Sequence, residues 1–154
     1  MEKLSEAIFS KRAILLTGKG GGGRTTIAAA LALAAARRGL RVLIAEVGEP
    51  DVDFSPLGAI FGHQTLPKQP TTLAPGVSGV MVWSRMGHER FLRMVLPIPA
   101  LVRAALRSGA LRRMLDAAPS LNELGVFDHL LSLGRENPDT GKAEYDLCIV
   151  DLPA

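Results

Sequence analysis

The sequence predicts an α/β protein with a doubly wound, mostly parallel sheet. Four short apolar runs have the length of strands, and segments rich in helix-forming residues stand between them. Apolar runs without polar alternation are typical of parallel strands that are buried on both faces. Because strands alternate with helices along the chain, we expect a sheet with helices on both faces.

The N-terminal third forms one strand–helix–strand unit. Residues 13–17 (AILLT) are an apolar run that stops at glycine, and residues 41–46 (RVLIAE) are a second run of strand length. Between them, residues 25–38 are rich in alanine and leucine, and Gly39 supplies a helix stop signal. Such units are almost always right-handed, with parallel strands.

The rest of the chain continues the alternation. Residues 48–76 are rich in proline, glycine and aspartate, so we expect mostly loop with a short helix around residues 57–61. Two further strands are expected at residues 77–84 and Leu147–Asp151. Three helices separated by prolines are expected between these strands, at residues 89–96, 100–117 and 121–133. A turn is expected after them, at residues 137–141.

Composition narrows the class of protein. Hydrophobic residues make up 47% of the chain and charged residues 21%, which is typical of a globular domain rather than a disordered one. Cys148 stands alone, so no internal disulfide is possible and a reducing, cytoplasmic compartment is expected. Residues 1–12 lack the apolar stretch of a signal peptide, and the apolar run at residues 27–36 is too short to span a bilayer.

Residues 18–25 (GKGGGGRT) are the segment that predicts phosphate binding. They match the phosphate-loop pattern G-x-x-x-x-G-K-[ST] between a strand and a helix, except that Arg24 stands where the lysine belongs. Glycines let several N–H groups point at one phosphate, and the following helix adds its positive end. Thr25 offers a hydroxyl to Mg²⁺, Thr26 is placed to contact the α-phosphate, and Arg24 keeps the positive charge in a wider, bidentate form. The alternative to a phosphate-binding loop is a flexible glycine turn without a ligand. The expected binding residues for ATP are Gly18, Lys19, Gly20, Gly21, Gly22, Gly23, Arg24, Thr25 and Thr26.

Residues 18–26 resemble the deviant Walker A motif, K-G-G-x-G-K-T-T. Within the superfamily that has this motif, the chain most resembles the ArsA-like ATPases of the anion-transporting and tail-anchored-protein-targeting type. Three other stretches are similar to that family's switch I, a helix start, and its Walker B and switch II strand: residues 46–61, 118–124 (APSLNEL) and 145–153 (YDLCIVDLP). The resemblance covers essentially the whole chain and implies a P-loop NTPase fold.

The resemblance also implies roles for the matched residues. Lys19 would reach across a dimer to the partner's phosphates, as an arginine finger does. Asp151 would hold Mg²⁺ together with Thr25. The acid that orients the attacking water is left open between Glu49 and Asp51, because the usual Asp-Pro pair is replaced here by Glu49-Pro50. The catalytic candidates are Lys19, Arg24, Glu49 and Asp51. The arsenite-binding cysteines have no counterpart, and Cys148 is expected to be a small core residue.

We expect residues 1–154 to form a single nucleotide-binding domain with a helical insert at about 89–135. The expected function is that of an ATPase subunit that binds Mg-ATP and couples hydrolysis to a conformational change in a partner. The alternatives are a ParA or MinD type positioning ATPase and a non-hydrolysing nucleotide-binding regulatory module. A homodimer or a heterodimer with a related subunit is expected, with a client or membrane protein as a further partner and no nucleic acid. The expected location is the cytoplasm, including its membrane face.

The family continues with further strands after the stretch that resembles residues 145–153, so the resemblance implies a sheet that is incomplete at the C-terminus. The strand at residues 13–17 is then expected at a sheet edge, with unpaired backbone groups along one side. We therefore expect the 154-residue chain to self-associate, aggregate or require a partner, rather than to be a stable monomer.

Overall fold

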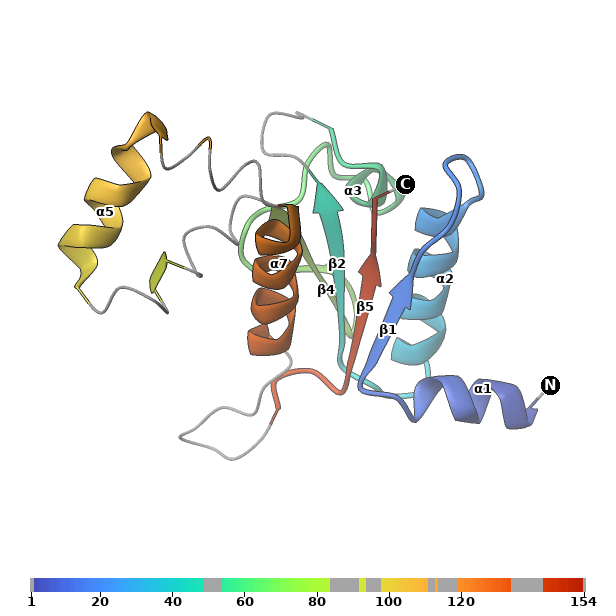
Figure 1. Ribbon diagram of the computed structural model, residues 1–154. Helices are drawn as coiled ribbons and strands as arrows, with labels where there is room; N and C mark the ends of the chain where they lie inside the picture. Colours follow the sequence, from blue (N-terminus) through green and yellow to red (C-terminus); the bar gives the residue numbers. More distant parts are fainter. Residues whose placement is uncertain are drawn as a thin grey trace. The chain divides into compact units, whose positions relative to one another are not determined.

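The computed structural model describes residues 2–48, 54–83, 92–93, 98–110, 113, 119–133 and 143–153. The chain divides into two compact units, Met1–Val82 with Leu133–Ala154 and Trp83–Ser132. The first unit contains the sheet, and the second contains helix α5 (Pro99–Arg107) and most of helix α7 (Pro119–Leu133), as Figure 1 shows. A single domain with a helical insert at about 89–135 stays a prediction.

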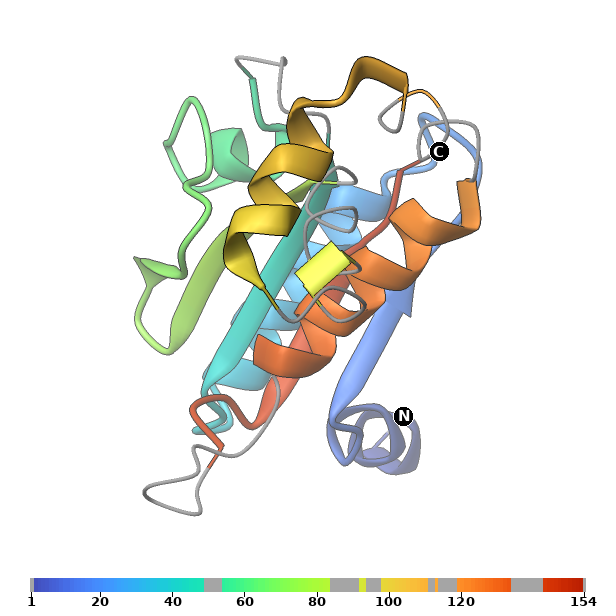
Figure 2. The same cartoon turned by 60° about the vertical axis from the view of Figure 1, so that its left-hand side comes forward.

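The sheet has five strands in the order β1-β5-β2-β4-β3. Their bounds in chain order are β1 (Ala13–Leu16), β2 (Val42–Gly48), β3 (Thr71–Ala74), β4 (Val77–Trp83) and β5 (Leu147–Asp151). Strands β1, β5 and β2 are parallel, whereas β3 and β4 are antiparallel. Figures 1 and 2 both show β5 between β1 and β2. This arrangement confirms the predicted α/β fold with a mostly parallel sheet.

The carboxyl ends of the three parallel strands are in register. Asp151, the last residue of β5, pairs with Leu16 at the end of β1 and with Glu46 near the end of β2. Residues 42–46 and 147–151 are all buried, which explains why both strands read as continuous apolar runs that finish in an acid. The register therefore places two carboxylates side by side at the carboxyl ends of the parallel strands, which we call the carboxyl edge of the sheet. Ligands bind at this end of the strands in open α/β folds.

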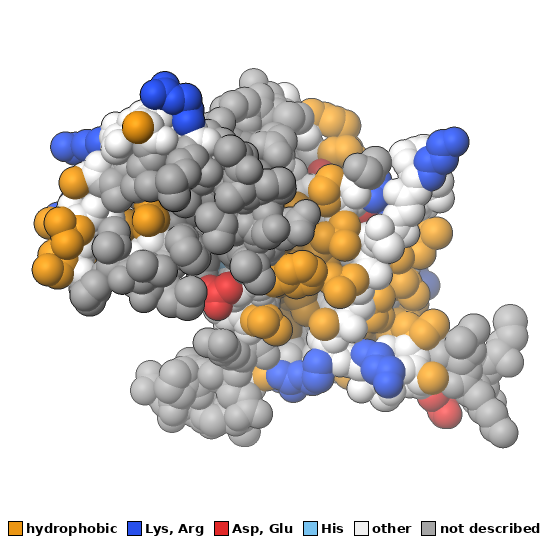
Figure 3. Space-filling view, viewed as in Figure 1, with side chains coloured by type: hydrophobic (Ala, Val, Ile, Leu, Met, Phe, Trp, Pro, Cys, Tyr) orange, Lys and Arg blue, Asp and Glu red, His pale blue; other side chains and the backbone are white. Residues whose placement is uncertain are grey.

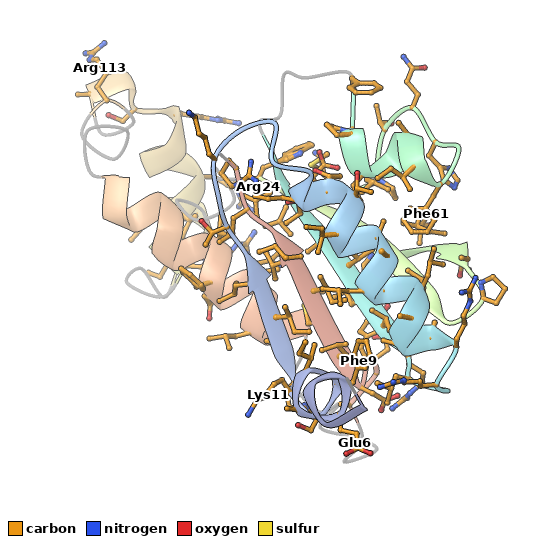
Figure 4. All side chains as sticks on the ribbon, turned by 90° about the vertical axis from the view of Figure 1, so that its right-hand side faces the viewer. Glu6, Phe9, Lys11, Arg24, Phe61 and Arg113 are labelled. Atoms are coloured by element: carbon orange, nitrogen blue, oxygen red, sulfur yellow. The ribbon has the colours of Figure 1, made fainter. Side chains whose placement is uncertain are left out.

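Helix α2 (Arg24–Ala36) packs against β2 and β5, and also against the short helix α3 (Pro56–Ile60). Figure 4 shows α2 lying over one face of the sheet. Its buried residues are all alanines, at positions 28, 29, 32 and 35. Small side chains let the helix approach the sheet closely, and they keep a high helix propensity. The helix ends at Ala36, and the turn that follows it includes Gly39, whose φ of 84° lies in the left-handed region that suits glycine.

Strand β1 is the end strand of the sheet, as the sequence predicts. Its residues are exposed or half-buried throughout, and the side chain of Leu15 is 50% exposed. Ile27, in the first turns of α2, is 49% exposed. Figure 3 shows hydrophobic side chains gathered on the part of the surface that contains β1. The first unit thus leaves apolar surface uncovered beside an open strand edge.

Strand β3 and helix α1 (Glu2–Phe9) were not predicted. Strand β3 lies within residues 48–76, which were expected to be mostly loop, and it corrects that expectation. It is held by its antiparallel partner β4, where the side chain of Leu73 packs on Gly79 so closely that a Cβ would collide with it. Helix α1 makes a cation–π contact through Phe9, since the guanidinium of Arg38 lies 4.7 Å from the centre of its ring.

The helical segments of the second unit differ in length from the prediction. The helix expected at residues 100–117 is interrupted, because α5 ends at Arg107 and Ser108 is not helical. Ser108 and Gly109 are weaker helix formers than the residues before them, which accounts for the break. The helix expected at residues 89–96 lies mostly outside the described residues, and the turn expected at 137–141 lies entirely outside them. No helix among the described residues is long and apolar enough to cross a membrane.

Candidate nucleotide-binding site

The loop between β1 and α2 has the geometry of an anion-binding turn. Gly21 and Gly23 have φ angles of 78° and 74°, in the left-handed region that suits glycine. The N–H of Gly22 donates to the carbonyl of Lys19 at 3.2 Å, which closes a tight turn. Gly23 is the N-cap of α2 and provides no side-chain acceptor. The N–H groups at the start of α2 therefore lack a capping side chain, and they form a positive helix end that favours an anion.

Thr25 and Asp151 are brought together by the contact of α2 with β5. The hydroxyl Oγ1 of Thr25 donates to Oδ2 of Asp151 at 2.6 Å, although 126 residues separate them. Asp151 is only 5% exposed, and its second oxygen, Oδ1, is buried without a hydrogen-bond partner among the described residues. A buried carboxylate oxygen without a partner is costly, and a bound cation or water would remove that cost.

This donor set fits Mg²⁺. A magnesium ion is usually held by one or two carboxylates together with waters and substrate phosphates, so a hydroxyl and one carboxylate beside a phosphate loop suffice. No cluster of three or more histidine, cysteine, aspartate or glutamate side chains able to hold a metal occurs in the described part of the chain. A cage made of protein ligands alone is therefore absent from this part, and the fit to Mg²⁺ depends on Thr25 and Asp151.

The side chain of Arg24 contacts the segment after β5 as well as the glycine loop. Its Nη1 donates to two main-chain carbonyls, those of Leu152 at 2.6 Å and Pro153 at 2.7 Å. Figure 4 shows Arg24 at the carboxyl end of the parallel strands. The side chain passes over the loop, because a Cβ at Gly18 would lie 3.4 Å from its Cδ. The residue at the lysine position of the phosphate-loop pattern is thus attached to the segment that follows Asp151.

Glu46 is a second buried acid at this edge, only 8% exposed. Its Oε2 accepts hydrogen bonds from the Ser55 hydroxyl and from the N–H of Leu57, the latter at 3.1 Å. Burial is the main cause that raises the pKa of Glu46, and the negative charge of Asp151 raises it further, whereas the two hydrogen bonds oppose the rise. Ser55 is also the N-cap of α3, where its Oγ accepts from the N–H of Gly58 at 2.7 Å. Glu46 therefore ties α3 to the edge that carries Asp151.

The structure brings together some of the predicted site residues and not others. Thr25, Arg24 and Asp151 meet at the ends of β1 and β5. Lys19 lies exposed in the loop. Glu49 and Asp51 lie outside the described residues, so their roles stay predictions. Cys148 is a buried core residue, as predicted, and burial raises the pKa of its thiol to about 11.

Sequence reasoning missed two members of this edge, Glu46 and Ser55. Each had a local signal. Glu46 ends an apolar run, as Asp151 does, and parallel strands bring such ends together. Ser55 precedes Pro56, and a serine followed by proline is a helix start signature. The carbonyls of Leu152 and Pro153 have no signature, because every residue has a carbonyl.

Comparison with known proteins agrees with this geometry. The family model described as anion-transporting ATPase matches residues 11–154. An uncharacterised protein of Streptomyces coelicolor is 38% identical over 144 residues, which are 92% of this chain and 34% of that protein. The ATPase BagA of Mycobacterium tuberculosis and a putative ATPase of Mycobacterium bovis are each 30% identical over 145 residues, which are 90% of this chain and 41% of theirs. The chain therefore spans less than half the length of these relatives.

Proposed function

The chain belongs to the ArsA-type family of anion-transporting ATPases, and from this premise we propose that it binds Mg-ATP at the carboxyl edge of its sheet. The observation that carries the proposal is the hydrogen bond between Thr25 and Asp151, directly beside the uncapped start of α2. A hydroxyl and an orphaned carboxylate oxygen next to an anion-binding turn are complementary to a metal ion bound to phosphates.

The residues of the site have distinct roles in this proposal. The N–H groups of the glycine loop and of the first turn of α2 bind the phosphate oxygens. Thr25 and Asp151 hold Mg²⁺, and Arg24 places a permanent positive charge beside the phosphates. When bound, Mg²⁺ would offset the negative charge that develops between the β- and γ-phosphates. Thr26 is exposed at the start of α2 and is assigned to the α-phosphate.

Hydrolysis requires residues beyond those that hold Mg²⁺ and the phosphates. We assign to Lys19 a contact with the phosphates of a second ATPase subunit, which its exposed position in the loop permits. Glu49 or Asp51 would orient the attacking water. Coupling to a partner would proceed through the segments that touch the site, which are α3 through Glu46 and residues 152–153 through Arg24. A related subunit in a dimer, and a client or membrane protein, are the partners proposed.

Two measurements on the purified chain test the proposal. Calorimetric titration with ATP should give saturable binding in the presence of Mg²⁺ and clearly weaker binding after chelation. A phosphate-release assay then measures turnover. The absence of binding at nucleotide concentrations up to about 1 mM, the upper end of usual KM values, would contradict the proposed function.

A non-hydrolysing nucleotide-binding module is the second candidate, and the position of Arg24 favours it. The guanidinium donates to main-chain carbonyls rather than lying free beside the loop, and its width differs from that of the lysine in the phosphate-loop pattern. Binding without phosphate release, in the presence of a longer relative as a partner subunit, would select this candidate. Phosphate release above the rate of a Thr25→Val variant would select the ATPase.

A further inference from the structure

Arg24 uses only one of its three nitrogens in the contact with residues 152–153. Nη1 carries two protons, and both are accounted for by the carbonyls of Leu152 and Pro153, at 2.6 and 2.7 Å. A guanidinium has five N–H donors in a rigid fork. Arg24 makes no other hydrogen bond among the described residues, so Nε and Nη2 retain three donors.

The remaining donors belong to a side chain that starts at the phosphate loop. Arg24 is the first residue of α2, and its Cδ lies over Gly18, the first glycine of the loop. The guanidinium is therefore held between two structures, the loop on one side and the chain after Asp151 on the other. Binding of a phosphate by Nε and Nη2 would not require either carbonyl bond to break, because both of those bonds use Nη1.

We propose that Arg24 is a bridge, which binds a nucleotide phosphate through Nε and Nη2 while Nη1 keeps both carbonyls. This inference rests on the proposed function and adds a positioning role: phosphate binding would fix residues 152–153 through a single side chain. A lysine has one nitrogen with three rotatable donors and no fork, so it cannot hold two carbonyls and a phosphate in the same way. The bridge gives a physical reason for an arginine at this position of the loop.

The segment that the bridge fixes is also held from β1. The N–H of Leu152 donates to the carbonyl of Leu16 at 3.1 Å. Leu152 thus accepts from Arg24 and donates to the last residue of β1, directly after the acid assigned to Mg²⁺. Amide hydrogen exchange at Leu152 reports local opening of this segment, and that opening should become rarer when a phosphate immobilises Arg24.

The test compares the chain with an Arg24→Lys variant, which keeps the charge, and with an Arg37→Lys variant as a matched control. Arg37 is an exposed arginine at the other end of α2. Exchange at Leu152 is followed by mass spectrometry with and without Mg-ADP. We expect Mg-ADP to slow it about 10-fold in the parent and in Arg37→Lys, the scale of one hydrogen bond to a charged group, and less than about 2-fold in Arg24→Lys.

A second measurement needs no variant. In protein with ¹⁵N-labelled arginine, the Nε resonance of Arg24 should shift when Mg-ADP is added. Calorimetric binding of Mg-ADP with an unmoved Nε resonance would overturn the bridge alone, and so would equal slowing of exchange in Arg24→Lys and the parent. Absence of any nucleotide binding to the parent chain would instead overturn the proposed function, and with it the bridge.

Discussion

Replacing Asp151 by asparagine should make the nucleotide-free chain more stable and abolish the dependence of nucleotide binding on Mg²⁺. Asp151 is 5% exposed, its Oδ1 has no partner among the described residues, and the pKa of Glu46 is raised in part by its charge. Asparagine keeps an oxygen that accepts from the Thr25 hydroxyl and removes the buried negative charge. The amide nitrogen takes the place of Oδ1, so the gain comes from removing a buried charge, which costs more to bury than a neutral amide, and we expect about 1 kcal/mol.

The opposite change at Thr25 provides the comparison. Thr25→Val keeps the shape of the side chain but removes the donor to Asp151, so that neither carboxylate oxygen keeps a hydrogen-bond partner within the described part of the chain. This variant should lose about 1–3 kcal/mol of stability. Thr72→Val, at an exposed position of β3, is the matched control and should change stability little.

Thermal unfolding without nucleotide measures both effects. For a chain of this size, about 1 kcal/mol corresponds to about 2–4 °C in Tm. Calorimetry with ATP, with and without Mg²⁺, measures the functional side of the exchange. A decrease in Tm for Asp151→Asn would refute the reasoning, because the carboxylate would then be a net stabilising group rather than one kept for a ligand at a cost in stability.

Four further predictions concern Arg24, Lys19, Asp146 and strand β1. Arg24→Ala should weaken Mg-ATP binding by about 1.5–3 kcal/mol, the scale of a lost charged hydrogen bond, and unchanged affinity by calorimetry would contradict the phosphate contact. Lys19→Ala should abolish phosphate release in a complete ATPase dimer while leaving nucleotide binding nearly intact; turnover at the parent rate would exclude its role. Asp146 is held by Arg41 at 2.8 Å, and the hydrogen bond lowers its pKa to about 2. Since the unfolded value is about 3.9, its stabilisation is present above that pH and disappears as the pH falls toward 2. The small decrease in Tm that Asp146→Asn causes at pH 7 should therefore vanish near pH 2. Finally, the open edge of β1 predicts self-association of the chain in sedimentation, and a monodisperse monomer with one cooperative unfolding transition would contradict it.

Apolar runs of strand length were the part of the fold that the sequence predicted best. Strands β1, β4 and β5 agree with the expected runs to within one residue. In β5 every residue is buried, so no polar residue interrupts the run before Asp151. Strand β3 escaped prediction because Thr71–Ala74 is short and partly exposed. Its register depends on Leu73 packing against Gly79 in the neighbouring strand, and this contact leaves no periodicity in the segment itself.

In the candidate site, some side chains could be predicted from the sequence, whereas contacts to main-chain carbonyls could not. Thr25 and Asp151 were identified because a hydroxyl after a glycine loop and an acid ending an apolar strand are uncommon in combination. The carbonyl contacts of Arg24 could not be predicted, since main-chain acceptors are the same at every residue and only the fold decides which ones come within reach. The buried position of Glu46 was missed because its two hydrogen-bond donors, on Ser55 and Leu57, lie 9 and 11 residues later in the chain, at the start of α3.

The central place of β5 explains how an event at the phosphate loop could reach distant parts of the first unit. Asp151 pairs on one side with Leu16, which precedes the loop, and on the other side with Glu46, which holds α3 through Leu57. A displacement of the end of β5 would therefore act on both neighbouring strands at once. Under the proposed bridge, a phosphate bound to Arg24 would fix residues 152–153 directly, and the pairing of β5 with β1 and β2 would extend that constraint to the loop and to α3.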